Sequence, residues 1–203
     1  MKIRFAGLVL LLSSAPFALQ GQVRSEAFGV AVRTATVNQK AAAATLPADG
    51  SLAQDQAGDV TIASLVTAQD AFATATGAAD GTQSDAVSTA TLGTVNILNG
   101  LITADGVVAM ASSTAGNSNA DGSSLSNIVV NGVQVSDPAP NTRVDLPGVG
   151  YVVLNEQIPT SSGITVNMIH VVLQQPVVGL LGRVTGYQTT GNIIVGSASS
   201  SVN

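Results

Sequence analysis

Apolar residues recur at every second position along much of the chain, and short runs of Gly, Pro, Asn and Ser interrupt them. Within residues 23–37, Phe28, Val30 and Val32 fall on one face, and Arg33 falls on the other. Successive side chains of a β-strand point to opposite faces, so this period of two predicts a half-buried strand. Residues 192–198 (NIIVGSA) are predicted to form a final strand.

The longest run with a strand signature is residues 141–173. Its Val- and Ile-rich segments are separated by Pro147-Gly148, Gly150 and Ser161-Ser162-Gly163, which are typical turn residues. We therefore expect two extended segments joined by a short link, as in a β-hairpin or a β-arch.

Several other segments carry turn or loop signals. Residues 39–56 are Ala-rich and contain Pro47, so we expect a loop there. Asn99-Gly100 and Asn131-Gly132 lie between apolar runs, which favours tight hairpin turns, with a bulge as the alternative. Residues 114–124 read as a polar loop.

Residues 60–81 and 95–116 resemble each other, and Leu65-Val66-Thr67-Ala68 aligns with Leu101-Ile102-Thr103-Ala104. A repeat of this kind indicates a solenoid, whereas a chance likeness between Ala- and Thr-rich strands leaves a sandwich. The expected fold class is all-β, as a β-sandwich or a solenoid-like stack of long strands.

The N-terminus has the order of features found in an export signal. Lys2 and Arg4 are followed by the apolar residues 5–12 and by small residues up to Ala18. We expect a cleaved secretory signal peptide at residues 1–21 and a single all-β extracellular domain at residues 22–203. The apolar run is too short for a membrane-spanning anchor.

Composition sharpens this picture. The chain is 45% hydrophobic but only 3% aromatic and 9% charged, so we expect thin β layers packed through small side chains. Without Lys2 and Arg4, five basic residues face twelve acidic ones, a net charge of −7. Such a protein has no electrostatic reason to bind nucleic acid, and the absence of cysteine excludes disulfides.

Catalytic chemistry finds little support. His170 is the only histidine, and counting by two places it on a face with Ile164, Val166, Met168 and Val172. We interpret it as a strand histidine. The carboxylates Asp145 and Glu156 are the best-placed pair for glycoside hydrolysis, but surface charges explain them better. We expect no catalytic residue, no cofactor and no enzyme activity.

Calcium is the more plausible ligand. Asn117, Asn119 and Asp121, followed by Gly122, place oxygen ligands at alternate positions of one loop, and Asp80 and Asp85 flank Gly81. No full calcium-binding pattern is present, and ordinary turns have the same composition. The pairs Thr74/Thr76 and Thr89/Thr91 place hydroxyls on one face, as a carbohydrate- or ice-binding surface would require.

Three blocks, residues 142–157 (TRVDLPGVGYVVLNEQ), 162–173 and 191–202, resemble the bacterial choice-of-anchor P family, with support from residues 25–30 and 95–105. The resemblance spans nearly the whole of residues 22–203. It implies an exported domain held at the cell surface by different C-terminal devices in different members, and no known catalytic activity. This chain shows no C-terminal anchor, which favours release or non-covalent association.

The expected function is therefore a non-enzymatic, secreted or cell-surface structural protein that self-assembles through β-strand addition. Its partners would be other copies of itself, as a homo-oligomer or fibre, or cell-surface material. We expect residues 23–37 to be the segment exchanged between subunits. The alternative is a secreted binding module or adhesin for carbohydrate, ice or a surface, and one form of this hypothesis includes stabilisation by calcium.

Overall fold

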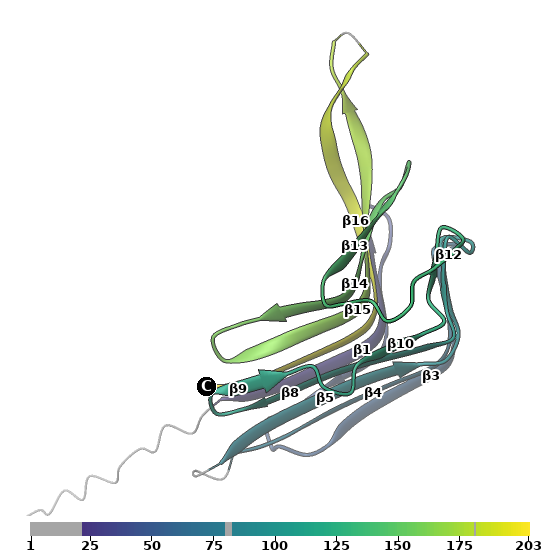
Figure 1. Cartoon of the computed structure of the whole chain (residues 1–203). Helices are drawn as coiled ribbons and strands as arrows, with labels where there is room; N and C mark the ends of the chain where they lie inside the picture. Colours follow the sequence, from purple (N-terminus) through teal and green to yellow (C-terminus); the bar gives the residue numbers. More distant parts are fainter. Residues whose placement is uncertain (1–21, 80–82, 181) are drawn as a thin grey trace, which may run out of the picture.

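The structure is a computed structural model that describes residues 22–79, 83–180 and 182–203. The expected signal peptide at residues 1–21 lies outside the described residues. All strand pairs described are antiparallel, and two sheets pack face to face (Figure 1). Of the two architectures that the sequence left open, the protein has the β-sandwich.

Sheet A has six strands in the order β13-β14-β15-β16-β1-β2. Its strands are β1 (Val23–Thr34), β2 (Asn38–Thr45), β13 (Thr142–Leu146), β14 (Gly150–Pro159), β15 (Gly163–Val178) and β16 (Val184–Val202). The first and last strands of the chain, β1 and β16, therefore pair in one sheet, and β2 lies on the other side of β1.

Sheet B has ten strands, with the order β10-β8-β5-β4-β6-β7-β11-β12 and with β3 on β4 and β9 on β8. Its strands are β3 (Ala53–Ile62), β4 (Val66–Ala79), β5 (Ser84–Leu92), β6 (Val95–Ile97), β7 (Ile102–Ala104), β8 (Gly106–Thr114), β9 (Asn117–Asn119), β10 (Ser124–Ser126), β11 (Val129–Val130) and β12 (Val133–Gln134).

Small side chains fill much of the space between the sheets. Alanines at the centre of β4, β5 and β8 are buried, Ala73, Ala90 and Ala109 among them. Serine hydroxyls bridge the layers: Ser25 Oγ donates to the carbonyl of Val87 at 2.7 Å. Because a serine side chain is short, it can bond to a carbonyl of the other sheet only where the two backbones lie close together. The expectation of thin layers packed through small side chains is confirmed.

The structure tests two sequence expectations, the loop at residues 39–56 and the two Asn-Gly hairpin turns. Residues 39–56 are not a loop, because β2 and the start of β3 occupy most of them. The expectation was wrong because alanine fits a strand where little space remains: Ala42 and Ala44 are buried. The hairpin turns are confirmed, since Asn99-Gly100 joins β6 to β7 and Asn131-Gly132 joins β11 to β12 with positive φ angles.

Both sheets bend sharply about halfway along their long strands (Figure 1). In sheet A the bend follows one row of opposed, unpaired residues on five neighbouring strands. The row consists of Ala42, Gly29, Gly196, Met168 and Asn155. Three of these have positive φ angles, and the in–out alternation of side chains shifts by one place at the row. Sheet A lies on the inner side of the bend, so its solvent-facing surface is concave.

A two-stranded arm, residues 174–180 and 182–190, projects from the sandwich as the continuation of β15 and β16 (Figure 1). The neighbouring strands stop at its base: β14 pairs with β15 only as far as Leu173, and β1 pairs with β16 only as far as Gly191. Beyond Gln174, whose N–H donates to the carbonyl of Val149 at 2.7 Å, neither outer edge of the described part of the arm is paired.

Candidate functional site

The concave face of sheet A holds a depression of about 490 Å³, here called the groove. At its centre lies a network of polar side chains from three adjacent strands. His170 Nδ1 lies 2.9 Å from Glu156 Oε2, and His170 Nε2 lies 3.1 Å from Asn192 Oδ1. Asn167 donates a second hydrogen bond to Glu156 Oε2 at 2.7 Å, and Ser197 donates to Asn167 Oδ1 at 2.7 Å.

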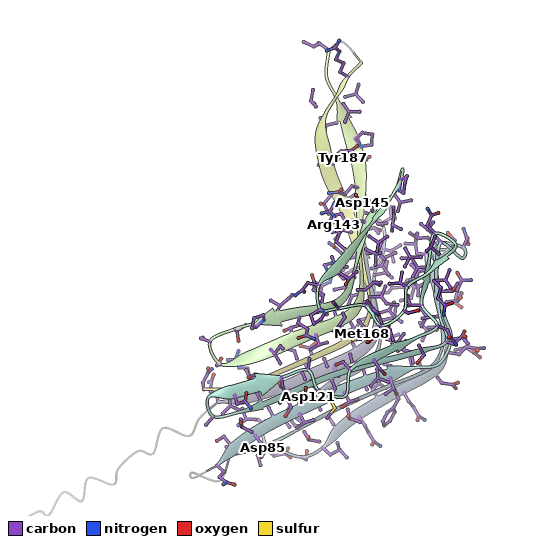
Figure 2. The ribbon with its side chains drawn as sticks, in the orientation of Figure 1. Asp85, Asp121, Arg143, Asp145, Met168 and Tyr187 are labelled. Carbon is purple, nitrogen blue, oxygen red and sulfur yellow. The ribbon has the colours of Figure 1, made fainter. Side chains whose placement is uncertain are left out.

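The bend determines which residues share this face. Counting by two placed His170 on a face with Ile164, Val166, Met168 and Val172. The prediction holds for Val172, which lies beyond the bend, and was wrong for the other three. The alternation shifts at Met168, so that Asn167 lies on the groove side before the bend and His170 lies there after it. Ile164, Val166 and Met168 face the core, and Figure 2 shows Met168 at the bend.

The network favours the charged forms of both ionisable members. Burial raises the pKa of Glu156, but the hydrogen bonds from His170 and Asn167 outweigh burial and leave the pKa below its usual value. The hydrogen bond to Glu156 raises the pKa of His170 more than burial lowers it. The side chains are only 19% and 16% exposed, so water screens the pair little. The imidazolium–carboxylate form of the pair therefore persists over a wider pH range than it would without these hydrogen bonds.

Basic side chains from β1 and β2 line the other side of the groove. Lys40 Nζ pairs with Glu26 Oε1 at 2.7 Å and lies 4.5 Å from the centre of the Phe28 ring. Arg33 lies opposite Asn192 in the β1–β16 register and is exposed, and its guanidinium has no hydrogen-bond or ion-pair partner among the described residues. Arg33 thus carries the groove's one uncompensated charge among those described.

The structure does not bring Asp145 and Glu156 together. Asp145 lies on β13 opposite Tyr151, five residues before Glu156 along β14, which is roughly 16 Å of strand. Its side chain is 76% exposed and pairs with Arg143 at 3.0 Å, near the base of the arm in Figure 2. The two carboxylates cannot flank one glycosidic bond.

The calcium candidates are dispersed. Asn117 and Asn119 belong to β9, whereas Asp121 lies in the following turn. Asn119 Oδ1 accepts the backbone N–H of Asp121 at 3.1 Å, so this amide oxygen stabilises its own turn. Asp80 lies outside the described residues, and Asp85 lies on β5 opposite Thr114 of β8, not in the turn that holds Asp121. Among the residues with described positions, no group of three His, Asp or Glu side chains could hold a metal ion.

The threonine pairs share the solvent-facing side of sheet B, as expected: Thr74 lies opposite Thr89, and Thr91 lies opposite Phe72. A second polar array was not foreseen. Thr61, Thr67, Asn96 and Thr103 form one cross-strand row, in a depression of about 510 Å³. A parallel row of Asp59, Gln69, Thr94 and Asp105 borders it.

Sequence reasoning missed the groove because its members lie far apart in the chain. Arg33 and Asn192 come together only because β1 pairs with β16. The one available signal was a polar residue within an apolar strand, as at Asn167 and His170, since a polar group inside a sheet needs partners on the neighbouring strands.

Comparisons with known proteins add no further constraint. No protein family, no curated protein and no solved structure matches the chain. Within the described residues, no helix has the length and apolar character needed to cross a membrane.

Proposed function

We propose that the protein is a non-enzymatic, exported structural protein that assembles with copies of itself by β-strand addition through the arm. The supporting observation is that residues 174–180 and 182–190 form a two-stranded arm whose edges have no partner strand beyond the single bond from Gln174 N–H to Val149 O. A strand edge is a template for pairing with another chain, and natural proteins usually protect it. An isolated two-stranded hairpin is also only marginally stable in water, so a third strand would stabilise it.

The side chains of the arm support the same proposal. Of the eight large hydrophobic residues that are exposed among the described residues, five lie on the arm: Val177, Val178, Leu180, Val184 and Tyr187. Figure 2 shows Tyr187 on the arm, where its side chain is 68% exposed and borders a depression shared with the turn between β13 and β14. Burying a half-exposed Val or a Tyr against another chain would contribute roughly 1 kcal/mol per residue.

The distribution of charge favours a second copy as the partner. Residues 41–142, which include all of sheet B, contain nine acidic residues and no basic one, whereas the arm's single charge is Arg183. An arm with one positive charge and no negative one is complementary to the acidic surface of a neighbouring copy.

The structure also changes which segment is proposed for exchange. Residues 23–37 form mainly β1, which is paired on one side with β16 and on the other with β2. Removing β1 would split sheet A, so its deletion cannot leave the remaining core intact. The arm can be removed without breaking a ladder of the sandwich.

The test is a variant in which an Asn-Gly turn replaces residues 175–188, compared with the chain comprising residues 22–203. We expect the intact chain to form oligomers or fibres by light scattering and electron microscopy, and the armless variant to be a monomer with an unchanged melting temperature. A matched pair refines the result: Val178→Thr/Tyr187→Thr should weaken assembly, while Leu52→Thr/Val133→Thr, at exposed sites off the arm, should not. Assembly without the arm, or a monomeric intact chain, would overturn the proposal.

A second candidate is a secreted binding module, and the polar array on sheet B favours it. The two rows offer eight hydroxyl, amide and carboxylate side chains and no apolar one. Polyhydroxylated ligands hydrogen-bond to such groups, and binding of a neutral polysaccharide that Thr67→Val abolishes would favour this candidate.

A further inference from the structure

The groove contains one cationic side chain without a partner, beside a network of polar side chains that hydrogen-bond to one another. Glu156 and His170 neutralise each other, and Glu26 and Lys40 do the same. Only Arg33 lacks a partner among the described groove residues, and it presents five N–H donors to solvent. A ligand for this site therefore needs an anionic group.

Asn192 adds a second donor at the same place. When both nitrogens of His170 carry protons, Nδ1–H donates to Glu156 and Nε2–H donates to Asn192 Oδ1. The amide oxygen of Asn192 is then used, its NH₂ group has no partner among the described residues, and Asn192 lies opposite Arg33 in the β1–β16 register. A guanidinium and an amide NH₂ next to each other are a suitable pair of donors for a carboxylate.

The rest of the groove matches a sugar better than a peptide. Short hydroxyl side chains line it beyond the bend: Ser197, Ser199 and Thr165, the last two hydrogen-bonded to each other at 2.9 Å. Ala31 and Ile194 lie opposite each other and form a small apolar floor. Hydroxyl groups suit sugar hydroxyls, and a small apolar floor suits the C–H face of a pyranose ring, whereas peptide side chains need deeper apolar pockets.

We propose that the groove binds a uronic acid unit of an acidic glycan, with Arg33 and the Asn192 amide holding its carboxylate. His170 acts as a positioning residue that fixes the orientation of the Asn192 amide. This site is independent of the arm and does not rest on self-assembly.

The arrangement predicts a dependence on pH. Once His170 loses a proton, Nε2 becomes an acceptor while Nδ1–H still donates to Glu156. Asn192 then rotates its amide to donate to Nε2, and its oxygen faces the ligand's carboxylate instead. The other charged groups that face His170 across the groove are Glu26 and Arg33 on β1 and Lys40 on β2.

The experiment is calorimetric titration of residues 22–203 with three probes: an oligogalacturonate, the corresponding neutral oligogalactoside and a poly-glutamate peptide of similar charge. We expect the oligogalacturonate alone to bind, and to bind several-fold more weakly at pH 8.5 than at pH 5.5. Binding of the neutral sugar as tightly as the acidic one, or of poly-glutamate as tightly as the glycan, would overturn the proposal. So would binding of none of the three.

Variants locate the site. Arg33→Gln should weaken oligogalacturonate binding at least tenfold, because it removes a charge-assisted pair. Asn192→Asp keeps an acceptor for His170 but places a carboxylate against the ligand, so binding should be lost while the fold persists. Arg143→Gln, an exposed arginine outside the groove, is the control and should change nothing.

The role of His170 has its own readout. Glu156→Gln removes the carboxylate that stabilises the imidazolium of His170. The pH at which affinity for the oligogalacturonate falls should therefore move downward, although the proposal places neither Glu156 nor His170 against the ligand. An unshifted profile in this variant, or a flat profile in the unmodified chain, would overturn the positioning role.

Discussion

The bend of sheet A depends on a glycine that the structure leaves no room to replace. Gly196 has a φ of +65°, and a Cβ added there would lie 2.6 Å from Val107 Cγ1 on sheet B. Gly196→Ala therefore combines two costs: a left-handed backbone for an L-residue, about 1–2 kcal/mol, and overpacking of the interface between the sheets, about 1–3 kcal/mol. The lower conformational entropy of the unfolded variant returns about 0.4–1 kcal/mol. We expect a net loss of about 2–4 kcal/mol.

Two other glycines separate the two costs. Gly132 has a φ of +75° but open space around its Cβ position, so Gly132→Ala should lose only about 1 kcal/mol. Gly186 has neither a positive φ nor a neighbour within 4 Å, so Gly186→Ala should lose nothing. Denaturant unfolding measures all three variants, and the melting temperature of Gly196→Ala should fall by roughly 5–15 °C.

A double variant tests the contact itself. Val107→Ala removes the methyl groups that the new Cβ would meet, so Gly196→Ala/Val107→Ala should lose at least about 1 kcal/mol less than the two single variants added together. Equal losses for Gly196→Ala and Gly132→Ala, or strict additivity in the double variant, would refute the reasoning that the sheets are in contact at the bend.

Two further predictions concern the polar groups of the fold. Because the pKa of Glu156 is lowered in the folded protein, its contribution to stability is lost as the pH falls through that pKa. Because the pKa of His170 is raised, its contribution is fully present below about pH 6.5 and is lost as the pH rises through the raised pKa. Thermal melts from pH 5 to 9 should therefore show Glu156→Gln most destabilised near pH 5–6.5, by roughly 1–2 kcal/mol, and a constant difference would contradict the pairing. Ser113→Ala should cost about 1–3 kcal/mol by urea unfolding, because Ser113 Oγ bonds Ser200 Oγ at 2.7 Å between the sheets, whereas the exposed Ser51→Ala should cost far less.

How far the sequence could lead differs between the fold and the site. Alternation along single segments predicted the strands at residues 23–37 and 192–198, because side-chain period is a local property. The prediction that Phe28 shares a face with Val30 and Val32 was wrong, because the alternation shifts at Gly29: Phe28 lines the groove, whereas the two valines lie in the core. It also placed the turns at Asn99-Gly100 and Asn131-Gly132, where positive φ angles need Asn and Gly. The Ala-rich strand β2 was missed because alanine has low β propensity on its own, and only the close approach of the other sheet makes it suitable there.

The groove could not be read from the sequence for a related reason. Its contacts join β1 to β16 and β14 to β15, pairings that depend on the topology of the whole sheet. The local count also failed at one residue: the alternation shifts at Met168, which moved His170 from a face that looked apolar to a face lined by Asn167 and Asn192. A single irregular position reverses the inference for every residue beyond it.

The bend links the packing of the two sheets to the shape of the groove. The row that includes Gly29 and Gly196 lies where sheet A curves, and the curvature makes the groove concave. A flat sheet of the same residues would have no concave face to receive a ligand. If the row were only a packing accident, straightening it would affect stability alone. If the row serves function, Gly196→Ala at a temperature where it remains folded should weaken oligogalacturonate binding and leave assembly through the arm unchanged, because the arm begins several residues away from the bend.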